Sequence, residues 1–82
     1  MNLIELRNKA KNIQPSVRIG KYGINLAAIE EIKRQLKNKK LVKIKLLKNS
    51  GMDTKETAKE LAVKTDSLLV DRVGRIIVLH KK

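Results

Sequence analysis

The sequence predicts an α/β fold: a single compact domain, residues 1–82, built around a four-stranded mixed sheet. Three observations lead to this prediction. The spacing of apolar residues alternates between helical and strand-like, in the order helix-strand-helix-strand-helix-strand-strand. Helices that separate strands call for parallel or mixed pairing, whereas the last two strands are close enough to form an antiparallel hairpin. Finally, 82 residues are enough for one domain and not for two.

Apolar residues at helical spacing predict a first helix near the start of the chain. They are Leu3, Leu6, Ala10 and Ile13. This helix should end near Gln14, because Pro15 disfavours helical backbone in the residue before it. Residues 16–19 then alternate between polar and apolar, which predicts a short strand.

The second helix is predicted to begin after Asn25, a good N-cap residue. Ile24 and Ile29 have the spacing of a hydrophobic staple around this cap. Glu30 and Arg34 are four residues apart and should form a favourable pair on the helix surface. The helix should end in the basic cluster 37–40.

Residues 41–47 form the clearest predicted strand, with apolar side chains on one face and Lys43 and Lys45 on the other. A turn at residues 49–51 follows. Asp53 and Glu56 then resemble a capping box that opens a third helix. The inner face of this helix is expected to contain Ala58, Leu61 and Ala62.

Two apolar segments close the chain, and each reads as a strand. They cover residues 68–72 and 76–80, and a turn at Val73-Gly74 separates them. The short connection predicts a hairpin. Apolar residues throughout the chain are expected to lie on the inner faces of these helices and strands.

Positive charge dominates the composition, with 20 Lys and Arg against eight Asp and Glu, a net charge of +12. The charge is sided: residues 1–48 contain thirteen basic residues against three acidic ones. Such a field favours a polyanionic partner. Nucleic acid is preferred to a membrane surface, because a membrane-surface helix usually carries aromatic anchors and the chain has no Trp or Phe.

The chain contains no cysteine, which excludes disulfides and thiolate metal sites. We therefore expect a cytoplasmic protein, with no membrane span because no apolar run approaches about 20 residues. Catalysis is not expected: one histidine and no acidic cluster provide neither a catalytic triad nor a metal site. We also expect no cofactor and no small-molecule substrate. A monomer is expected because nothing in the sequence resembles a coiled-coil seam.

The segment Gly20-Lys21-Tyr22-Gly23 joins the first strand to the second helix. Helix N-termini attract anions, and glycine lets the backbone approach a phosphate closely. A lone GxxG is usually an ordinary turn, but here a strand precedes it, a cap follows it and a lysine lies inside it. Its spacing fits neither a P-loop nor a dinucleotide fingerprint, so the pattern favours a nucleic-acid backbone over ATP or NAD.

These residues resemble the CRM domain family (chloroplast RNA splicing and ribosome maturation), including the free-standing YhbY-like RNA-binding proteins. The family's G-K-x-G loop is matched by residues 20–23, its lysine-alternating strand by residues 41–45, and its closing hairpin and last strand by residues 74–79. The resemblance implies a fold similar to the C-terminal domain of translation initiation factor 3. It also implies RNA binding, and for a stand-alone member an association with precursor large ribosomal subunits.

The loop and the basic surface beside it are the predicted RNA-binding site. Its candidate residues are Arg18, Gly20, Lys21, Tyr22, Gly23, Asn25, Lys33, Arg34, Lys37, Lys43 and Lys45. Tyr22 is the sole aromatic residue and either stacks on a base or packs against the neighbouring helix. One aromatic residue is too few for a base-stacking platform, so we expect recognition of backbone and shape in structured RNA.

Two other functions stay open at this point. The first is a small basic protein that coats DNA in the manner of chromatin proteins. The second is a ribosome-associated adaptor whose partner is a protein, which would need a large exposed apolar patch. The expected commitment of apolar residues to inner faces argues against the adaptor.

Overall fold

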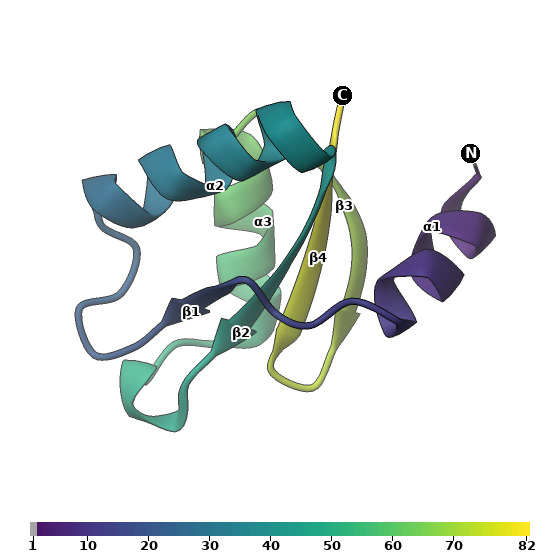
Figure 1. Cartoon of the computed structure of the whole chain (residues 1–82). Helices are drawn as coiled ribbons and strands as arrows, with labels where there is room; N and C mark the ends of the chain where they lie inside the picture. The colour runs from purple at the N-terminus through teal and green to yellow at the C-terminus, as the bar shows by residue number, and fades with distance from the viewer. Residues whose placement is uncertain (1) are drawn as a thin grey trace.

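A four-stranded mixed sheet runs through the centre of the protein in a computed structural model that describes residues 2–82. Its strands are β1 (Val17–Ile19), β2 (Leu41–Leu46), β3 (Ser67–Val73) and β4 (Ile76–Lys81). They lie in the order β1-β2-β4-β3, with β1 parallel to β2 and the other neighbours antiparallel (Figure 1). The predicted fold class is confirmed.

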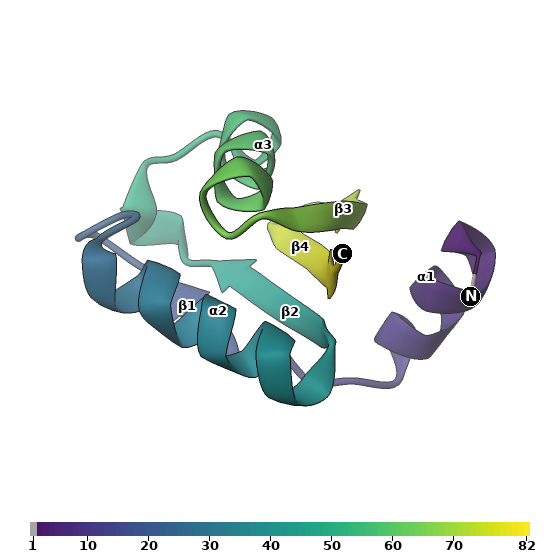
Figure 2. The same ribbon diagram turned by 90° about the horizontal axis from the view of Figure 1, so that it is seen from above.

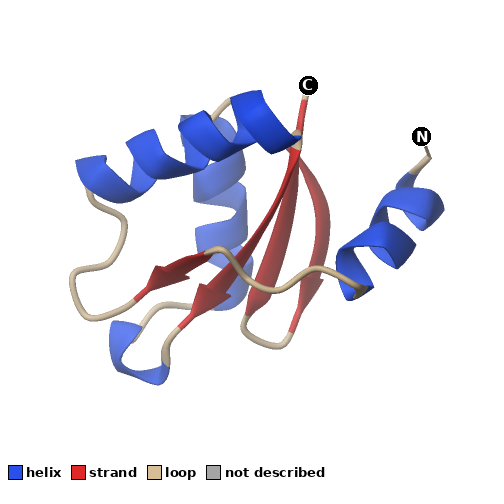
Figure 3. Ribbon diagram, viewed as in Figure 1, coloured by secondary structure: helices blue, strands red, loops and turns tan. Residues whose placement is uncertain are grey.

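Three helices cover the two faces of the sheet. They are α1 (Leu3–Lys11), α2 (Leu26–Lys39) and α3 (Thr54–Lys64), and a 3₁₀ turn, η1 (Lys48–Ser50), follows β2. Figures 2 and 3 show α2 and α3 on one face and α1 on the other. No helix among residues 2–82 has the length and apolar character needed to cross a membrane.

Two groups of buried apolar side chains hold these layers together. The group between the sheet and α2 and α3 consists of Val17, Ile19, Ile29, Ile32, Leu36, Val42, Ile44, Leu46, Ala58, Leu61, Ile77 and Leu79. The group beneath α1 consists of Leu6, Ala10, Leu41, Val70 and Val78. Since burying a large apolar side chain contributes about 1.5–3 kcal/mol, the first group provides most of the stability and α1 is held by far less.

A side chain caps the start of each of the three helices, and the caps of α2 and α3 are the ones that the sequence predicted. Asn25 Oδ1 accepts a hydrogen bond from the amide of Ala28 at 2.8 Å. Asp53 accepts from the amide of Glu56 at 3.3 Å, which is one half of the predicted capping box. α1 is capped in the same way by Asn2, a residue the apolar pattern did not single out.

Several predicted strand ends differ from the observed ones by one residue, and the end of the first helix and the hairpin turn also differ. α1 ends at Lys11 rather than near Gln14, because Asn12 caps it and its amide bonds back to the carbonyls of residues 9 and 10. The hairpin turn is Gly74-Arg75, one residue later than predicted, since Val73 still pairs with Ile76 and Gly74 has a φ of +57°.

The predicted surface pair on α2 is wrong in its partner. The guanidinium of Arg34 bonds Glu31, three residues before it, through Nε at 3.1 Å and Nη2 at 2.5 Å, and not Glu30. The carboxylate of Glu31 is also held by Gln35 Nε2 at 2.8 Å. This second donor favours Glu31 over its neighbour as the partner of Arg34.

The expectation that apolar residues lie on inner faces is only partly correct. Several large apolar side chains are exposed: Leu3, Ile4, Leu26, Val63, Leu68, Leu69 and Val73. They come from all three helices and from the edge strand β3. They are therefore spread over several elements of the fold, and scattered exposed apolar residues are ordinary in soluble proteins.

Candidate nucleic-acid interface

The GKYG segment forms a tight turn between β1 and α2. The amide of Gly23 donates to the carbonyl of Gly20 at 2.9 Å, so the two residues between them lie at the tip. Gly23 has a φ of +63°, a left-handed conformation that other residues rarely adopt. The Tyr22 side chain is 78% exposed, and the Lys21 ammonium lies 5.2 Å from the centre of its ring. The tip therefore presents a cation and an aromatic ring to solvent.

Gly20 lets this turn lie against the segment that follows β2. A Cβ on Gly20 would be 3.3 Å from Asn49 Oδ1 and 3.4 Å from Leu47 Cδ1. The amide of Leu47 donates to the carbonyl of Ile19 at 2.8 Å, which continues the pairing of the two strands. Because β1 and β2 are parallel, the segments after them meet at the same end of the sheet.

The first turn of α2 opens onto a groove beside this loop. The groove has a volume of about 400 Å³ and is lined by β1, the loop and the start of α2, with Ala27 and Ala28 on the helix side. The first bond of the helical ladder joins the Ile29 amide to the Asn25 carbonyl. Of the amides before it, that of Ala28 is taken by the Asn25 cap, and those of Leu26 and Ala27 make no bond within the helix and add to the positive end of the helix dipole.

One carboxylate also lines the groove. Glu31 is held there by Arg34 and Gln35, and the hydroxyl of Ser16 donates to the other end of the Gln35 amide. Hydrogen bonds from Arg34 and then from Gln35 lower the pKa of Glu31 to about 2. The same pairing raises the pKa of Arg34. The carboxylate therefore stays ionised well below neutral pH, as one half of an ion pair with Arg34.

Two candidate residues lie side by side on the sheet face that carries α1, in the part that α1 does not cover. Arg18 on β1 is directly opposite Lys45 on β2, and both are exposed. Neither forms an ion pair with a carboxylate among residues 2–82. Like charges placed opposite each other destabilise a sheet, and a bound anion would remove this repulsion.

Lys43 lies on the same face but has partners inside the protein. Its ammonium donates to the carbonyls of Ala10 and Ile13, each at 3.1 Å. These carbonyls belong to the end of α1 and to the linker that follows it. The structure thus gives Lys43 a role in attaching α1, and its contact with RNA stays a prediction.

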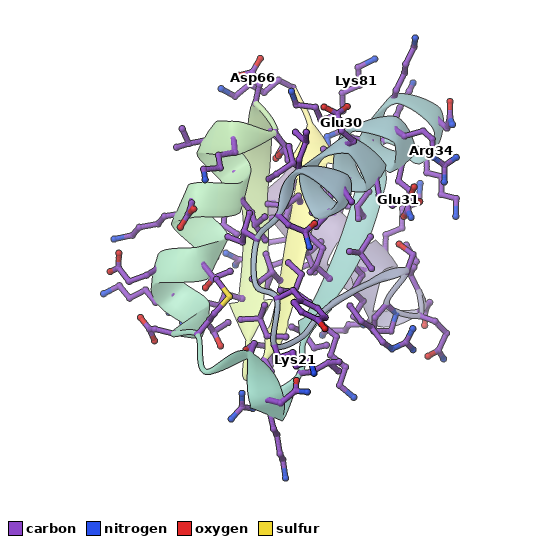
Figure 4. All side chains as sticks on the ribbon, turned by 90° about the vertical axis from the view of Figure 1, so that its left-hand side faces the viewer. Lys21, Glu30, Glu31, Arg34, Asp66 and Lys81 are labelled. Atoms are coloured by element: carbon purple, nitrogen blue, oxygen red, sulfur yellow. The ribbon has the colours of Figure 1, made fainter. Side chains whose placement is uncertain are left out.

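The remaining candidates on α2 lie away from the loop. Lys33 and Lys37 line a separate hollow of about 350 Å³ near the carboxyl end of the helix, together with Asp66 and Lys82. Arg34 lies on the outer side of α2, where Figure 4 labels it beside Glu31. The predicted site is therefore one cluster around the loop plus a distant group on α2.

Two cations near the loop are not among the candidates that the sequence pattern indicated. Lys48 lies in η1, directly after β2. Arg75 lies in the hairpin turn, and its carbonyl accepts from the amide of Leu46 at 2.8 Å, which places the turn beside the end of β2. Both residues are exposed. Finding Arg75 would have required the pairing of β4 with β2, which the apolar pattern does not specify.

The family model described as the CRS1 / YhbY (CRM) domain matches residues 2–81. The chain is 35% identical over 77 residues to the protein named "Probable RNA-binding protein YqeI" of Bacillus subtilis, covering 94% of this chain and 80% of the relative. It is 38% identical over 78 residues to "Probable RNA-binding protein MJ0652" of Methanocaldococcus jannaschii, covering 93% of this chain and 58% of the relative.

One solved structure is similar to this protein in both fold and sequence. The solution structure of the hypothetical protein SAV1595 from Staphylococcus aureus superposes with a TM-score of 0.83 at 40% sequence identity. The superposition covers 98% of this chain and 83% of that protein.

Proposed function

The chain belongs to the CRS1/YhbY (CRM) domain family, and from this premise we propose that it binds RNA by contacting the sugar–phosphate backbone at the GKYG loop. One observation carries the proposal: a lysine-tipped turn and the first amides of α2 adjoin the same groove. Gly23 gives the turn its left-handed backbone, and Gly20 lets the turn lie against the segment after β2.

Four further cations support an extended backbone contact at this end of the protein. They are Arg18, Lys45, Lys48 and Arg75, all of them exposed. If about five cations including Lys21 contact phosphates, the affinity for RNA should fall with salt with a log–log slope of roughly −3.5 to −4.5. A single exposed ring, Tyr22, is available for stacking on one base, so sequence specificity should be modest.

A charge-matched pair of variants tests the loop. Lys21→Gln should weaken binding to a structured RNA hairpin by roughly tenfold, about 1.4 kcal/mol, and reduce the magnitude of the salt slope by about 0.7–0.9. Lys59→Gln removes the same charge from the exposed face of α3 and should have a much smaller effect. Equal affinities for the two variants would remove the loop from the mechanism.

RNA and DNA duplexes of equal length at equal salt separate the proposal from a DNA-coating protein. We expect RNA to bind more tightly, because relatives in the family are named as RNA-binding proteins. A preference for DNA would favour the alternative.

The resemblance of the chain to free-standing family members supports a finer proposal. We propose that the bound RNA is ribosomal, that the protein acts as a monomer without catalysis in the assembly of the large ribosomal subunit, and that it does so in the cytoplasm. Crosslinking in cells followed by sequencing of the attached RNA tests this. Large-subunit ribosomal RNA is the expected product, and recovery of intron or transfer RNA would redirect the proposal.

A further inference from the structure

A second hollow lined with lysines lies at the other end of α2 from the GKYG loop. It has a volume of about 480 Å³ and opens between α1, the end of α2 and the sheet. Four lysines line it: Lys9, Lys39, Lys40 and Lys81. We call this hollow the lysine pocket. No Asp or Glu is among the described residues that line it.

The four lysines of the pocket have no carboxylate partner. Among residues 2–82, the basic residues that pair with a carboxylate are Arg7, Arg34, Lys64 and Lys82, and none of these lines the pocket. Four ammonium groups around one hollow repel one another, and an anion placed between them would remove this repulsion. The pocket is therefore complementary to a polyanion.

Stabilisation of the helices explains each lysine at most singly and does not explain why they gather around one hollow. Lysines in the last turn of a helix are favourable with the helix dipole, which accounts for Lys39. Lys9 lies in the last turn of α1 and is favourable with the dipole of that helix in the same way, whereas Lys81 comes from β4 and has no such reason. Three separate elements place lysines around the same hollow.

The wall of the pocket suits a nucleic-acid strand better than a small inorganic ion. Leu6 and Leu41 lie beneath it and are almost fully buried, whereas Leu68 is 47% exposed at its side. Apolar surface beside cations can contact a ribose or base while the ammonium groups pair with the phosphates.

The cationic surface continues around the end of α2. The neighbouring hollow shares Lys81 and adds Lys33, Lys37 and Lys82. Its one carboxylate, Asp66, already accepts from Lys82 Nζ at 3.0 Å. Figure 4 shows Lys21 and Lys81 at opposite ends of the molecule. The 14 residues of α2 that separate the two ends rise by about 21 Å.

We propose that the lysine pocket is a second contact site for the backbone of the same RNA that the loop binds. The inference rests on the proposed function for its ligand. The pocket takes phosphates about 21 Å from the loop, so the domain holds a structured RNA at two separated points. RNA that touches both sites is bound more tightly and in one orientation.

A triple variant with a charge-matched control tests the pocket. Lys9→Gln, Lys39→Gln and Lys81→Gln together remove three charges from it, and Lys55→Gln, Lys59→Gln and Lys64→Gln remove three from α3. Lys40 is left unchanged because its φ of +69° makes it the left-handed cap of α2. Because two or three ammonium–phosphate pairs should no longer form, the magnitude of the salt slope should fall by about 1.4–2.7 in the pocket variant and by clearly less in the α3 variant.

Lysine acylation of the complex, followed by mass spectrometry, locates the contact directly. RNA should protect Lys9, Lys39 and Lys81 and leave Lys55 and Lys59 reactive. Free AMP serves as a probe for a small ligand. If AMP protects the pocket lysines and RNA does not, the pocket is a nucleotide site and the proposal is overturned.

The outcomes separate this inference from the proposed function. If Lys21→Gln weakens binding and the pocket variant matches the α3 variant, the second site is refuted and the loop stands. If the pocket variant weakens binding and Lys21→Gln does not, the pocket is supported and the loop mechanism is refuted. Should the triple variant unfold, Lys81→Gln against Lys59→Gln repeats the test with an expected slope change of about 0.7–0.9.

Discussion

Replacing Gly23 with alanine should destabilise the protein by about 1–2 kcal/mol, the strain of left-handed backbone in a residue with a Cβ. Gly23 has a φ of +63°, and an added Cβ would meet Met52 Sδ at 3.6 Å, an ordinary contact. The cost therefore arises from the backbone and not from crowding. Gly20 has no positive φ, and its Cβ would crowd Asn49 Oδ1, a side-chain atom that can move away. Gly20→Ala should accordingly destabilise by only about 0.5 kcal/mol.

Urea unfolding followed by circular dichroism measures these differences, with Gly51→Ala as the control. Gly51 has a φ of +66° and open space around its Cβ position, so it reports backbone strain alone. In a domain of this size, 1 kcal/mol lowers Tm by roughly 4–8 °C. Titration of the same variants with RNA should show weaker binding for Gly23→Ala than for Gly51→Ala, because only Gly23 shapes the turn that carries Lys21.

Two results would refute this reasoning. If Gly20→Ala proved as destabilising as Gly23→Ala, left-handed backbone would not be what distinguishes the two glycines. If Gly23→Ala lost stability but kept its full affinity for RNA, the shape of the turn would not matter for binding.

Three further substitutions test other parts of the structure. Lys43→Met should weaken the attachment of α1 by about 1–3 kcal/mol, seen as faster hydrogen exchange in α1, because the carbonyl of Ile13 loses its side-chain donor and that of Ala10 keeps only the Ile13 amide. Lys45→Met should raise stability slightly, because it removes the repulsion from Arg18, and should reduce RNA affinity. Arg34→Gln should raise the pKa of Glu31 from about 2 towards 4.5, measured by NMR titration. Because that pKa is lowered by folding, the stabilisation is present above pH 4.5 and lost as pH falls towards 2, and unfolding of the variant should depend less on pH in this window. Asn25→Ala should destabilise by about 0.5–2 kcal/mol in thermal unfolding, and Asn25→Asp by much less, because the aspartate keeps the cap.

Local patterns in the sequence predicted the parts of the fold that depend on local physics. Alternating residues in β2 and helical spacing in α2 place Val42 and Ile32 in one buried group, where both are less than 2% exposed. The capping residues of α2 and α3 were readable because each cap acts within three residues of itself. The GKYG segment was recognisable for the same reason, and the family it indicated is confirmed.

Contacts between distant segments could not be read in this way. The strand order β1-β2-β4-β3 places the hairpin turn beside the end of β2, and so adds Arg75 to the surface near the loop. Likewise, nothing local to Lys43 indicates that α1 lies across its face of the sheet and supplies two carbonyls. The face that a helix covers depends on packing, which periodicity does not specify.

The position of charges in the fold also differs from their position along the chain. The first 48 residues carry most of the excess charge, yet the structure divides that excess between the two ends of α2. Lys81, from the last strand, completes the lysine pocket. Leu41, which lines the pocket, and Lys45, which adjoins Arg18, lie on the same face of β2, four residues apart, or about 13 Å. Both proposed contacts can therefore be reached from one face of the sheet.

Glu31 gives a physical reason for the RNA to follow that face. Its carboxylate lines the groove between β1 and α2 and remains ionised, since Arg34 and Gln35 bond it. A phosphate chain that continued along the groove beyond the first amides of α2 would meet this carboxylate, whereas one crossing the loop towards Arg18 and Lys45 meets only cations among these residues. To reach the lysine pocket, such a chain must pass over the linker after α1 (Figure 1), whose carbonyl at Ile13 is held by Lys43. Lys43 thus donates to two backbone carbonyls that lie beneath the RNA. Lys45 and the lysines of the pocket have no such partners among residues 2–82 and can pair with the phosphates.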